Sequence, residues 1–158
     1  MWSGKHAPCR LHQLVETQTE QIEQLRSQGF VLAPELSYSP VPDGLLVTGY
    51  IRCEGGLYLQ VKQLIQLAAK AGATGLFVVE AYSYKGVLSG SGTIFRYDSP
   101  HPDHNTEHHV HEYLVIGEDT GGQPPRFLYL EEEIPTLGDA LRRLYYWYLD
   151  NDPGDVLL

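Results

Sequence analysis

Two apolar runs on either side of Glu54-Gly55-Gly56 constrain the fold more strongly than any other part of the sequence. Residues 45–53 and 57–65 have the side-chain composition of strands, and the three residues between them form a short connection. Glycine tolerates positive φ, which tight connections between antiparallel strands often require. The segment therefore predicts a β-hairpin.

Strand-like segments continue on both sides of this hairpin and are separated by turn residues. Pro40-Val41-Pro42-Asp43-Gly44 is typical of a turn, and residues 86–92 are glycine-rich, which predicts a flexible connection. An alanine-rich segment at 66–72 predicts a short helical turn that ends at Gly72. Further strands are predicted at residues 30–38, 76–84, 93–98, 107–117 and 126–130.

One helix is predicted at each end of the chain. Residues 11–27 carry a thin apolar stripe, and Gly29 ends this helix because glycine adopts the left-handed conformation easily. Near the C-terminus, Thr136 and Asp139 have a spacing close to that of a capping box. The side chains that follow at helical spacing would cover one face of the sheet: Leu137, Ala140, Leu141, Leu144, Tyr145 and Tyr148. The predicted fold class is therefore α+β: an antiparallel β-meander of about six strands flanked by an N-terminal and a C-terminal helix.

The composition of the 158 residues is that of one globular domain, with 42% hydrophobic and 20% charged residues. The formal net charge of −9 argues against a broad basic face for nucleic acid, but it leaves local phosphate contacts and a basic partner open. Cys9 and Cys53 form neither a disulfide framework nor a CxxC motif, which indicates a reducing compartment. No run approaches the ~20 apolar residues of a membrane span, and the N-terminus lacks the apolar core of a signal peptide. We therefore expect a cytoplasmic protein that does not bind membranes.

The histidines are concentrated in one part of the sequence. Five of the seven lie between His101 and His111, directly after Arg96-Tyr97-Asp98. Alternate side chains of a strand share a face, so Arg96 lies on the same face of its strand as Asp98, and His109 lies on the same face of its strand as His111. Three consecutive antiparallel strands would then present Tyr82, Arg96, Asp98, His109 and His111 as one patch.

Imidazole and guanidinium groups together suit attack at phosphorus in RNA. One of His109 and His111 would take a proton from a 2′-hydroxyl, and the other would protonate the leaving oxygen. Arg96 would clamp the charge that develops on the phosphoryl oxygens, and Asp98 would orient one imidazole. Tyrosines can stack on a base or donate to phosphate. The residues proposed for substrate binding are Tyr84, Tyr97, His101 and Tyr113.

Two other interpretations use the same residues. His109-Val110-His111 presents two imidazoles that could bind a divalent metal such as zinc, with Asp98, Asp103, His101 or His104 as further ligands. This pair is similar to the HxH element of cupin barrels, in which an acid follows at shorter spacing than Glu118 does here. A non-enzymatic interaction module, with tyrosines at its interface, is the third hypothesis. His101 and His104 could also lie in an exposed, proline-rich loop without any function. No tightly bound metal is expected to be needed for folding, because the cysteines lack ligand spacing.

The polar run at 96–102, followed by residues 106–111, resembles the signature of the TumE-type toxin family, whose members carry a stretch close to RYDNAPHHP and then PHHKH. The likeness extends to the Tyr-Ser-Tyr segment at 82–84, the hairpin at 44–65 and the segment at 133–137. It covers residues 40–150 and leaves residues 1–39 as a divergent N-terminal helix and strand. Ser99 stands where the family has Asn, Glu107 replaces Pro and Val110 replaces Lys. Where the family usually has an acid, this chain has Lys62 or Gln63. The family's pattern is kept at Arg96, Asp98, His109 and His111.

This resemblance implies a small toxin of a bacterial toxin–antitoxin pair that acts on RNA. A helix-turn-helix antitoxin would hold such a toxin inactive. The resemblance agrees with the expectation of a metal-independent ribonuclease that needs no cofactor. The sequence leaves a homo-oligomeric state open.

Overall fold

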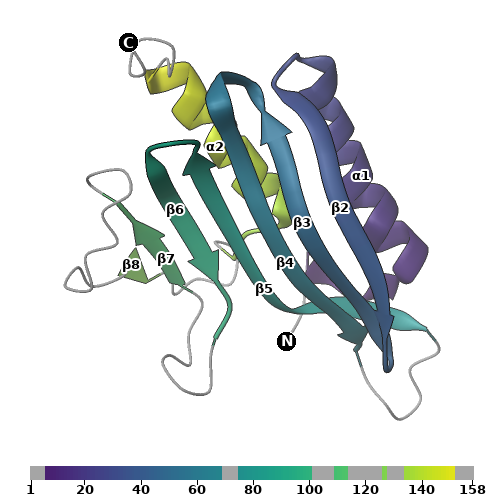
Figure 1. Ribbon diagram of the computed structural model, residues 1–158. Helices are drawn as coiled ribbons and strands as arrows, with labels where there is room; N and C mark the ends of the chain where they lie inside the picture. Colours follow the sequence, from purple (N-terminus) through teal and green to yellow (C-terminus); the bar gives the residue numbers. More distant parts are fainter. Residues whose placement is uncertain (1–5, 69–74, 101–108, 114–125, 128–133, 152–158) are drawn as a thin grey trace.

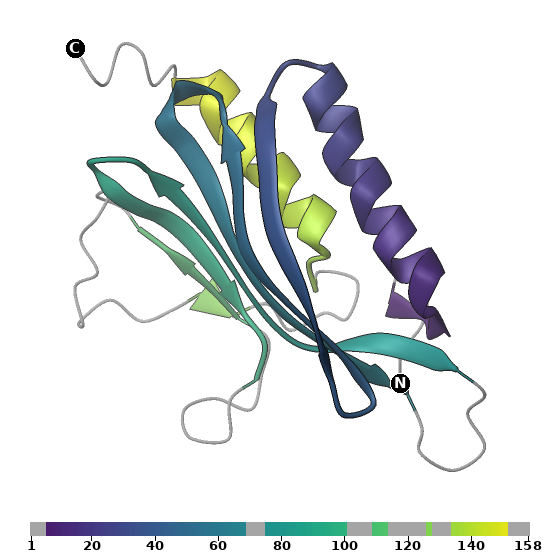
Figure 2. The same ribbon diagram turned by 45° about the vertical axis from the view of Figure 1, so that its right-hand side comes forward.

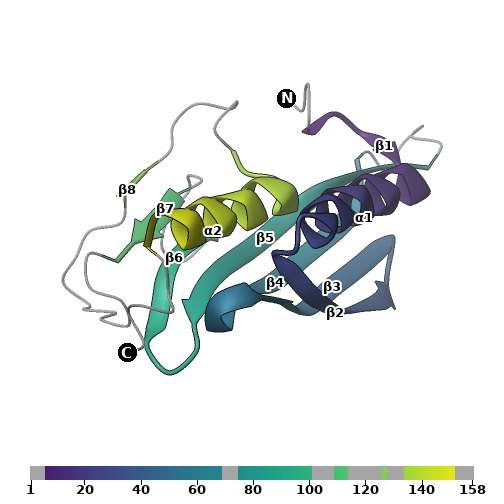
Figure 3. The ribbon, with the colours of Figure 1, turned by 90° about the horizontal axis from the view of Figure 1, so that it is seen from above.

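An antiparallel sheet forms one layer of the fold, and two helices lie on one of its faces (Figure 1; Figure 3). The computed structural model describes residues 6–68, 75–100, 109–113, 126–127 and 134–151. The elements are β1 (Cys9–Arg10), α1 (Leu11–Ser27), β2 (Val31–Val41), β3 (Gly44–Cys53), η2 (Glu54–Gly56), β4 (Leu57–Leu67), β5 (Leu76–Leu88), β6 (Gly92–Asp98), β7 (His109–Glu112), β8 (Arg126–Phe127) and α2 (Leu137–Asn151).

The strands follow one another in the order β2-β3-β4-β5-β6-β7-β8, and every neighbouring pair is antiparallel. The short strand β1 lies off this path and pairs with the start of β5. A helix precedes the meander and another follows it (Figure 2). The predicted α+β class is therefore confirmed. Within the part of the chain that the structure describes, neither helix has the length and apolar character needed to cross a membrane.

The hairpin predicted around Glu54-Gly55-Gly56 is present and consists of β3 and β4. Its connection needs two glycines, because Gly55 has φ 69° and Gly56 has φ 76°. The predicted helical turn at 66–72 is wrong for Gln66 and Leu67, which continue β4 and pair with Val78 and Phe77 of β5. The ladder with β5 outweighs the weak helix preference of so short a segment. Residues 69–74 lie outside the described part of the chain.

The predicted glycine-rich connection at 86–92 is also shorter than expected, because β5 continues to Leu88. Gly86 lies within the strand and has no Cβ, and this leaves room for the ring of Phe95 on β6. A Cβ at Gly86 would lie only 2.5 Å from Cε1 of Phe95. Close packing of the ring, rather than a turn, therefore explains this glycine.

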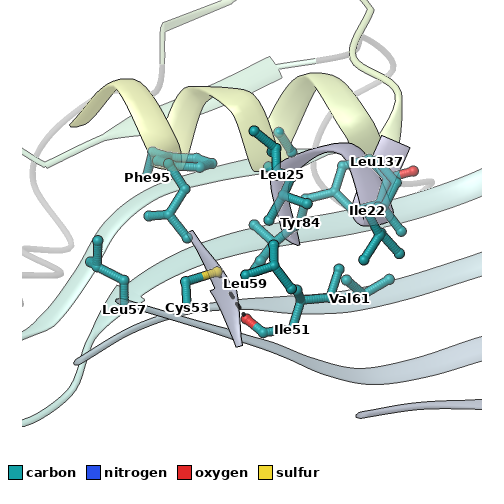
Figure 4. Packing of buried hydrophobic residues seen from close by; sticks show 14 of the residues in the cluster. Ile22, Leu25, Ile51, Cys53, Leu57, Leu59, Val61, Tyr84, Phe95 and Leu137 are labelled. Carbon is teal, nitrogen blue, oxygen red and sulfur yellow. Dashed lines mark hydrogen bonds between the residues drawn. The ribbon is translucent and has the colours of Figure 1, made fainter. Parts of the chain in front are cut away.

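The hydrophobic core lies between the helices and the covered face of the sheet (Figure 4). Side chains of β4 alternate between buried and more exposed positions, as expected for a sheet with one covered face. The core includes Ile22 and Leu25 of α1, together with apolar side chains of α2 and of the strands β3 to β6. Burial raises the pKa of the Cys53 thiol to about 12, so this thiol stays protonated. We call the other side of the sheet, on which neither of the two described helices packs, the open face.

The N-terminus of α2 is stabilised by the predicted capping box. The backbone N–H of Asp139 donates to Oγ1 of Thr136 at 3.1 Å, and the backbone N–H of Thr136 donates to Oδ2 of Asp139 at 2.9 Å. Thr136→Ala removes one of these bonds and should lower the free energy of unfolding by about 1 kcal/mol. Urea denaturation measures this difference.

Thr19→Ala is the matched control for this prediction. Thr19 is exposed inside α1, and its hydroxyl bonds only to the carbonyl of Val15. We expect a change within about 0.5 kcal/mol for this control. Equal effects of the two substitutions would show that the Thr136 hydroxyl does not act as a cap.

Candidate functional site

A buried carboxylate at the end of β6 organises the polar side chains of the open face. Oδ1 of Asp98 accepts a hydrogen bond from Oγ of Ser83 on β5 at 2.9 Å. Its Oδ2 accepts from Nε of Arg96 at 2.7 Å. The same oxygen lies 3.6 Å from Nε2 of His111 on β7, a distance for an ion pair rather than a hydrogen bond. Three neighbouring strands thus converge on one carboxylate.

The groups around this carboxylate differ in their access to solvent. The side chain of Asp98 is 6% exposed, whereas those of Arg96 and His111 are 31% and 23% exposed. A buried carboxylate is stable only when it is paired and hydrogen-bonded, which the three contacts provide. Asp98 therefore positions a guanidinium and an imidazole that both reach the surface.

The register of the sheet explains why these residues meet. Ser83 pairs with Asp98 across β5 and β6, and Arg96 pairs with His111 across β6 and β7. Residues in such rows lie on the same face of a sheet. The structure thus brings Arg96, Asp98 and His111 together on one face.

His109 is the Cα partner of Asp98 in the ladder between β6 and β7. Its side chain lies outside the described part of the structure, as does the whole of His101, which was predicted to bind substrate. Their predicted roles stay predictions.

Tyr82 is a correction, because it lies on the covered face and not beside Asp98. The β5–β6 ladder starts with Leu88 opposite Gly92 and Val87 opposite Thr93. Continued regularly, that register would place Tyr82 opposite Asp98. A β-bulge between Gly86 and Val87 shifts the ladder by one residue, so that Ser83 pairs with Asp98. A shift of one residue exchanges the two faces of a strand.

The covered-face position removes Tyr82 from the patch predicted around Asp98. Burial, and to a lesser degree the neighbouring phenol of Tyr84, raises the pKa of the Tyr82 hydroxyl. The ring stacks on that of Tyr84, with 5.0 Å between the centroids. Tyr82 is therefore a neutral part of the core.

Two of the tyrosines predicted to bind substrate, Tyr84 and Tyr97, lie on the covered face, whereas the predicted role of Tyr113 stays a prediction. Tyr84 is fully buried on the covered face, and its hydroxyl accepts a hydrogen bond from Nε2 of Gln63 at 2.7 Å. The hydroxyl of Tyr97 accepts from Nη1 of Arg143 on α2 at 2.8 Å. Tyr113 follows β7, and its backbone N–H donates to the carbonyl of Ile94 at 3.3 Å. Tyr84 and Tyr97 therefore lie on the opposite side of the sheet from Asp98, and the prediction that they bind substrate at this site is wrong.

Arg143 anchors the covered side of the strands that carry the site. Its Nη2 donates to Glu112 of β7 at 3.0 Å, and its guanidinium carbon lies 5.0 Å from the ring centroid of Phe95 and 5.3 Å from that of Tyr97. The helix α2 thereby holds β6 and β7 together from the side opposite to Asp98. Arg96 and His111 lie on the other side of the same two strands.

Comparison with known proteins finds no matching family model, no matching curated protein and no matching solved structure.

Several open-face residues were missed by the sequence interpretation. One row of the sheet runs from Lys62 through Ser83 to Asp98, and the next runs from Tyr50 through Gln60 and Lys85 to Arg96. Alternation along β4 and along β5 indicates which residues of each strand share a face. Whether Asp98 lies on the same face as these residues depends on the bulge in the β5–β6 ladder. The open face therefore has more cations near Asp98 than the predicted patch.

Of the alternative metal site formed by His109, His111 and Asp98, the structure describes the side chains of His111 and Asp98. Among the described side chains, no group of three or more His, Cys, Asp or Glu is arranged to hold a metal ion. The side chain of His109 is not among those described.

Proposed function

We propose that this chain is a toxin-like ribonuclease that cleaves RNA on the open face without a metal ion. The observation that carries the proposal is the pairing of Arg96 and His111 with the buried carboxylate of Asp98. A preorganised cation and a neighbouring proton-transfer group are the two elements that phosphodiester cleavage needs most. The resemblance to TumE-type toxins rests on the same residues.

The proposed reaction is an intramolecular transesterification. A histidine takes the proton of the 2′-hydroxyl, whose oxygen attacks phosphorus and forms a 2′,3′-cyclic phosphate. The bond to the 5′-oxygen breaks, and a second histidine supplies the proton that this leaving oxygen requires. We assign these two proton transfers to His109 and His111. We assign to Arg96 the stabilisation of the charge that develops on the phosphoryl oxygens.

The basic residues of the open face support a nucleic-acid substrate despite the net charge of −9. Lys62 and Lys85 lie in the two rows that contain Asp98 and Arg96. A local cluster of cations can follow a phosphate backbone even on an acidic protein. Because only a few cations would contact the backbone, we expect a modest salt dependence of binding.

An aromatic pair lies on the same face beyond these cations. Tyr50 is 45% exposed, and its ring centroid lies 5.6 Å from that of Tyr58. Exposed rings beside cations stack the bases of single-stranded nucleic acid. This arrangement favours single-stranded RNA over a duplex, whose bases are already stacked.

The proposed partner is a helix-turn-helix antitoxin, which the family resemblance implies. Three exposed acidic side chains of α1 offer a surface for a basic partner: Glu16, Glu20 and Glu23. Complementary charge of this kind accelerates association and selects partners.

Single-stranded RNA incubated with the protein in EDTA tests the proposal. We expect products that end in a 2′,3′-cyclic phosphate and a 5′-hydroxyl. The same oligonucleotide with one 2′-deoxy position should resist cleavage at that position alone. Cleavage of the deoxy position at an undiminished rate, or activity that appears only with added metal, would refute the mechanism. Absence of cleavage under every condition would favour the interaction-module hypothesis.

A further inference from the structure

One row of open-face residues crosses the sheet from β7 to β2. Each residue is the Cα partner of the next, in the order His111, Arg96, Lys85, Gln60, Tyr50 and Glu35. Residues directly opposite each other on neighbouring antiparallel strands share a face, so these six side chains lie in one line. The row therefore leads from the candidate site across the strands to the edge strand β2 (Figure 1).

Lys85 lies next to Arg96 in this row, so two cations face each other across β5 and β6. Arg96 is paired with Asp98, whereas Lys85 forms no ion pair with a residue in the described part of the chain. Like charges directly opposite each other destabilise a pair of strands. An anion that contacts both groups would replace this repulsion by attraction. The position of Lys85 therefore suits a second phosphate beside the one at Arg96.

Tyr50 offers an aromatic ring farther along the row. It is 45% exposed, and the ring of Tyr58 meets it at an interplanar angle of 76°. This edge contact supports the Tyr50 ring while much of it stays open to solvent. Nucleic-acid bases stack on exposed rings of this kind, whatever their sequence. Tyr50 therefore suits a base rather than a phosphate.

The spacing of the strands sets the distance between these two positions. Tyr50 on β3 is three strands away from Arg96 on β6. Neighbouring strands lie about 4.7–4.9 Å apart, so the two residues are separated by about 14–15 Å across the sheet. A nucleic-acid strand with stacked bases advances about 3.4 Å per nucleotide, and an extended strand advances farther. A base on Tyr50 therefore belongs to a nucleotide about two to four positions from the phosphate at Arg96.

The row ends on β2 with a neutralised carboxylate. Glu35 pairs with Arg52 at 3.2 Å, so the two side chains together carry no net charge. This pair offers a phosphate no net attraction, in contrast to Lys85 and Arg96. The part of the row that attracts nucleic acid therefore ends at Tyr50.

We propose that this row is a track for a single-stranded RNA segment of about four to six nucleotides, which crosses the strands from His111 to Tyr50. The inference rests on the proposed function, because it takes the scissile phosphate to lie at Arg96. Lys85 binds the neighbouring phosphate, and Tyr50 stacks a base farther along. A dinucleotide would reach Lys85 but not Tyr50.

Binding of oligodeoxynucleotides to the full chain tests the track without cleavage. These probes lack the 2′-hydroxyl that the proposed reaction requires, but they keep the phosphates and bases that the track contacts. Competition against a fluorescent decamer gives the affinities of unlabelled adenine oligonucleotides of two, six and ten residues. We expect the hexamer to bind at least about tenfold more tightly than the dimer. The decamer should bind within about threefold of the hexamer, because the track ends at Tyr50.

Tyr50→Ala locates the stacked base. It should weaken binding of the hexamer about tenfold and leave binding of the dimer unchanged. Tyr146→Ala is the matched control, because Tyr146 is 58% exposed and lies on α2, on the covered side of the sheet. This control should leave both affinities unchanged. Since both tyrosines are exposed, neither variant is expected to prevent folding.

Lys85→Ala tests the phosphate contact through the dependence of hexamer binding on salt. Loss of one phosphate contact should reduce the slope of log affinity against log salt concentration by about 0.7. Tyr50→Ala should leave this slope unchanged. Arg26→Ala is the control for loss of a cation, because Arg26 is an exposed residue of α1 that pairs with Glu23 at 3.5 Å.

Three results would overturn the track: equal binding of dimer and hexamer, equal effects of Tyr50→Ala and Tyr146→Ala, or an unchanged slope in Lys85→Ala. Absence of RNA cleavage together with the expected binding results would refute the proposed function instead. The two failures are therefore distinguishable.

Discussion

His111→Ala is expected to lower the rate of RNA cleavage by a factor on the order of 10²–10⁴, which is the usual contribution of one proton-transfer group. His111 reaches the surface beside Arg96 and is held near Asp98, so the substitution removes the imidazole that the site positions. Single-turnover cleavage of the RNA oligonucleotide in EDTA measures the loss. Arg96→Ala should have an effect of about 3–4 kcal/mol on transition-state stability, because it removes the cation from the phosphoryl oxygens.

Arg52→Ala is the matched control for the loss of a cation. Arg52 is exposed, and it pairs with Glu35 at 3.2 Å rather than with Asp98. Its removal should change the cleavage rate by less than about threefold, since isolated surface ion pairs contribute little. Urea denaturation of each variant separates loss of activity from loss of folding. Full activity of His111→Ala, or equal losses in Arg52→Ala and Arg96→Ala, would remove these residues from the mechanism.

Local sequence signals were sufficient for most of the architecture. The helix predicted at 11–27 has those bounds, and the chain ends it at Gly29 with φ 85°. The capping box and the two-glycine hairpin were equally predictable, because each depends on a few neighbouring residues. Local signals failed at residues 66–67, where pairing with a strand distant in sequence determines the backbone.

The candidate site depends on the register between strands, which local sequence signals do not determine. Alternation along β6 placed Arg96 and Asp98 on one face, as the structure has them. Alternation cannot say which residues of β5 share that face, because this depends on the register between the strands. The bulge, whose extra residue is Ile94 of β6, places Ser83 rather than Tyr82 opposite Asp98. The sequence near Gly86 does not show whether this glycine lies beside a bulge or in a regular strand.

Phe95→Ala is expected to lower the free energy of unfolding by about 3–5 kcal/mol, the largest stability change that we predict. The ring is almost fully buried, lies over Gly86 and contacts the guanidinium of Arg143. Its loss would create a cavity between α2 and β6 and would also remove the cation–π contact. Urea denaturation at constant m-value measures the change.

The contact between Phe95 and Gly86 can be tested by a double-mutant cycle. Gly86→Ala alone places a Cβ within 2.5 Å of the Phe95 ring and should destabilise the protein by about 1–3 kcal/mol. In the Phe95→Ala background this clash is absent, and the added methyl group fills part of the cavity. Gly86→Ala should then be neutral or stabilising, with a coupling energy of about 0.5–3 kcal/mol. Strict additivity of the two substitutions would mean that the ring does not pack on this glycine.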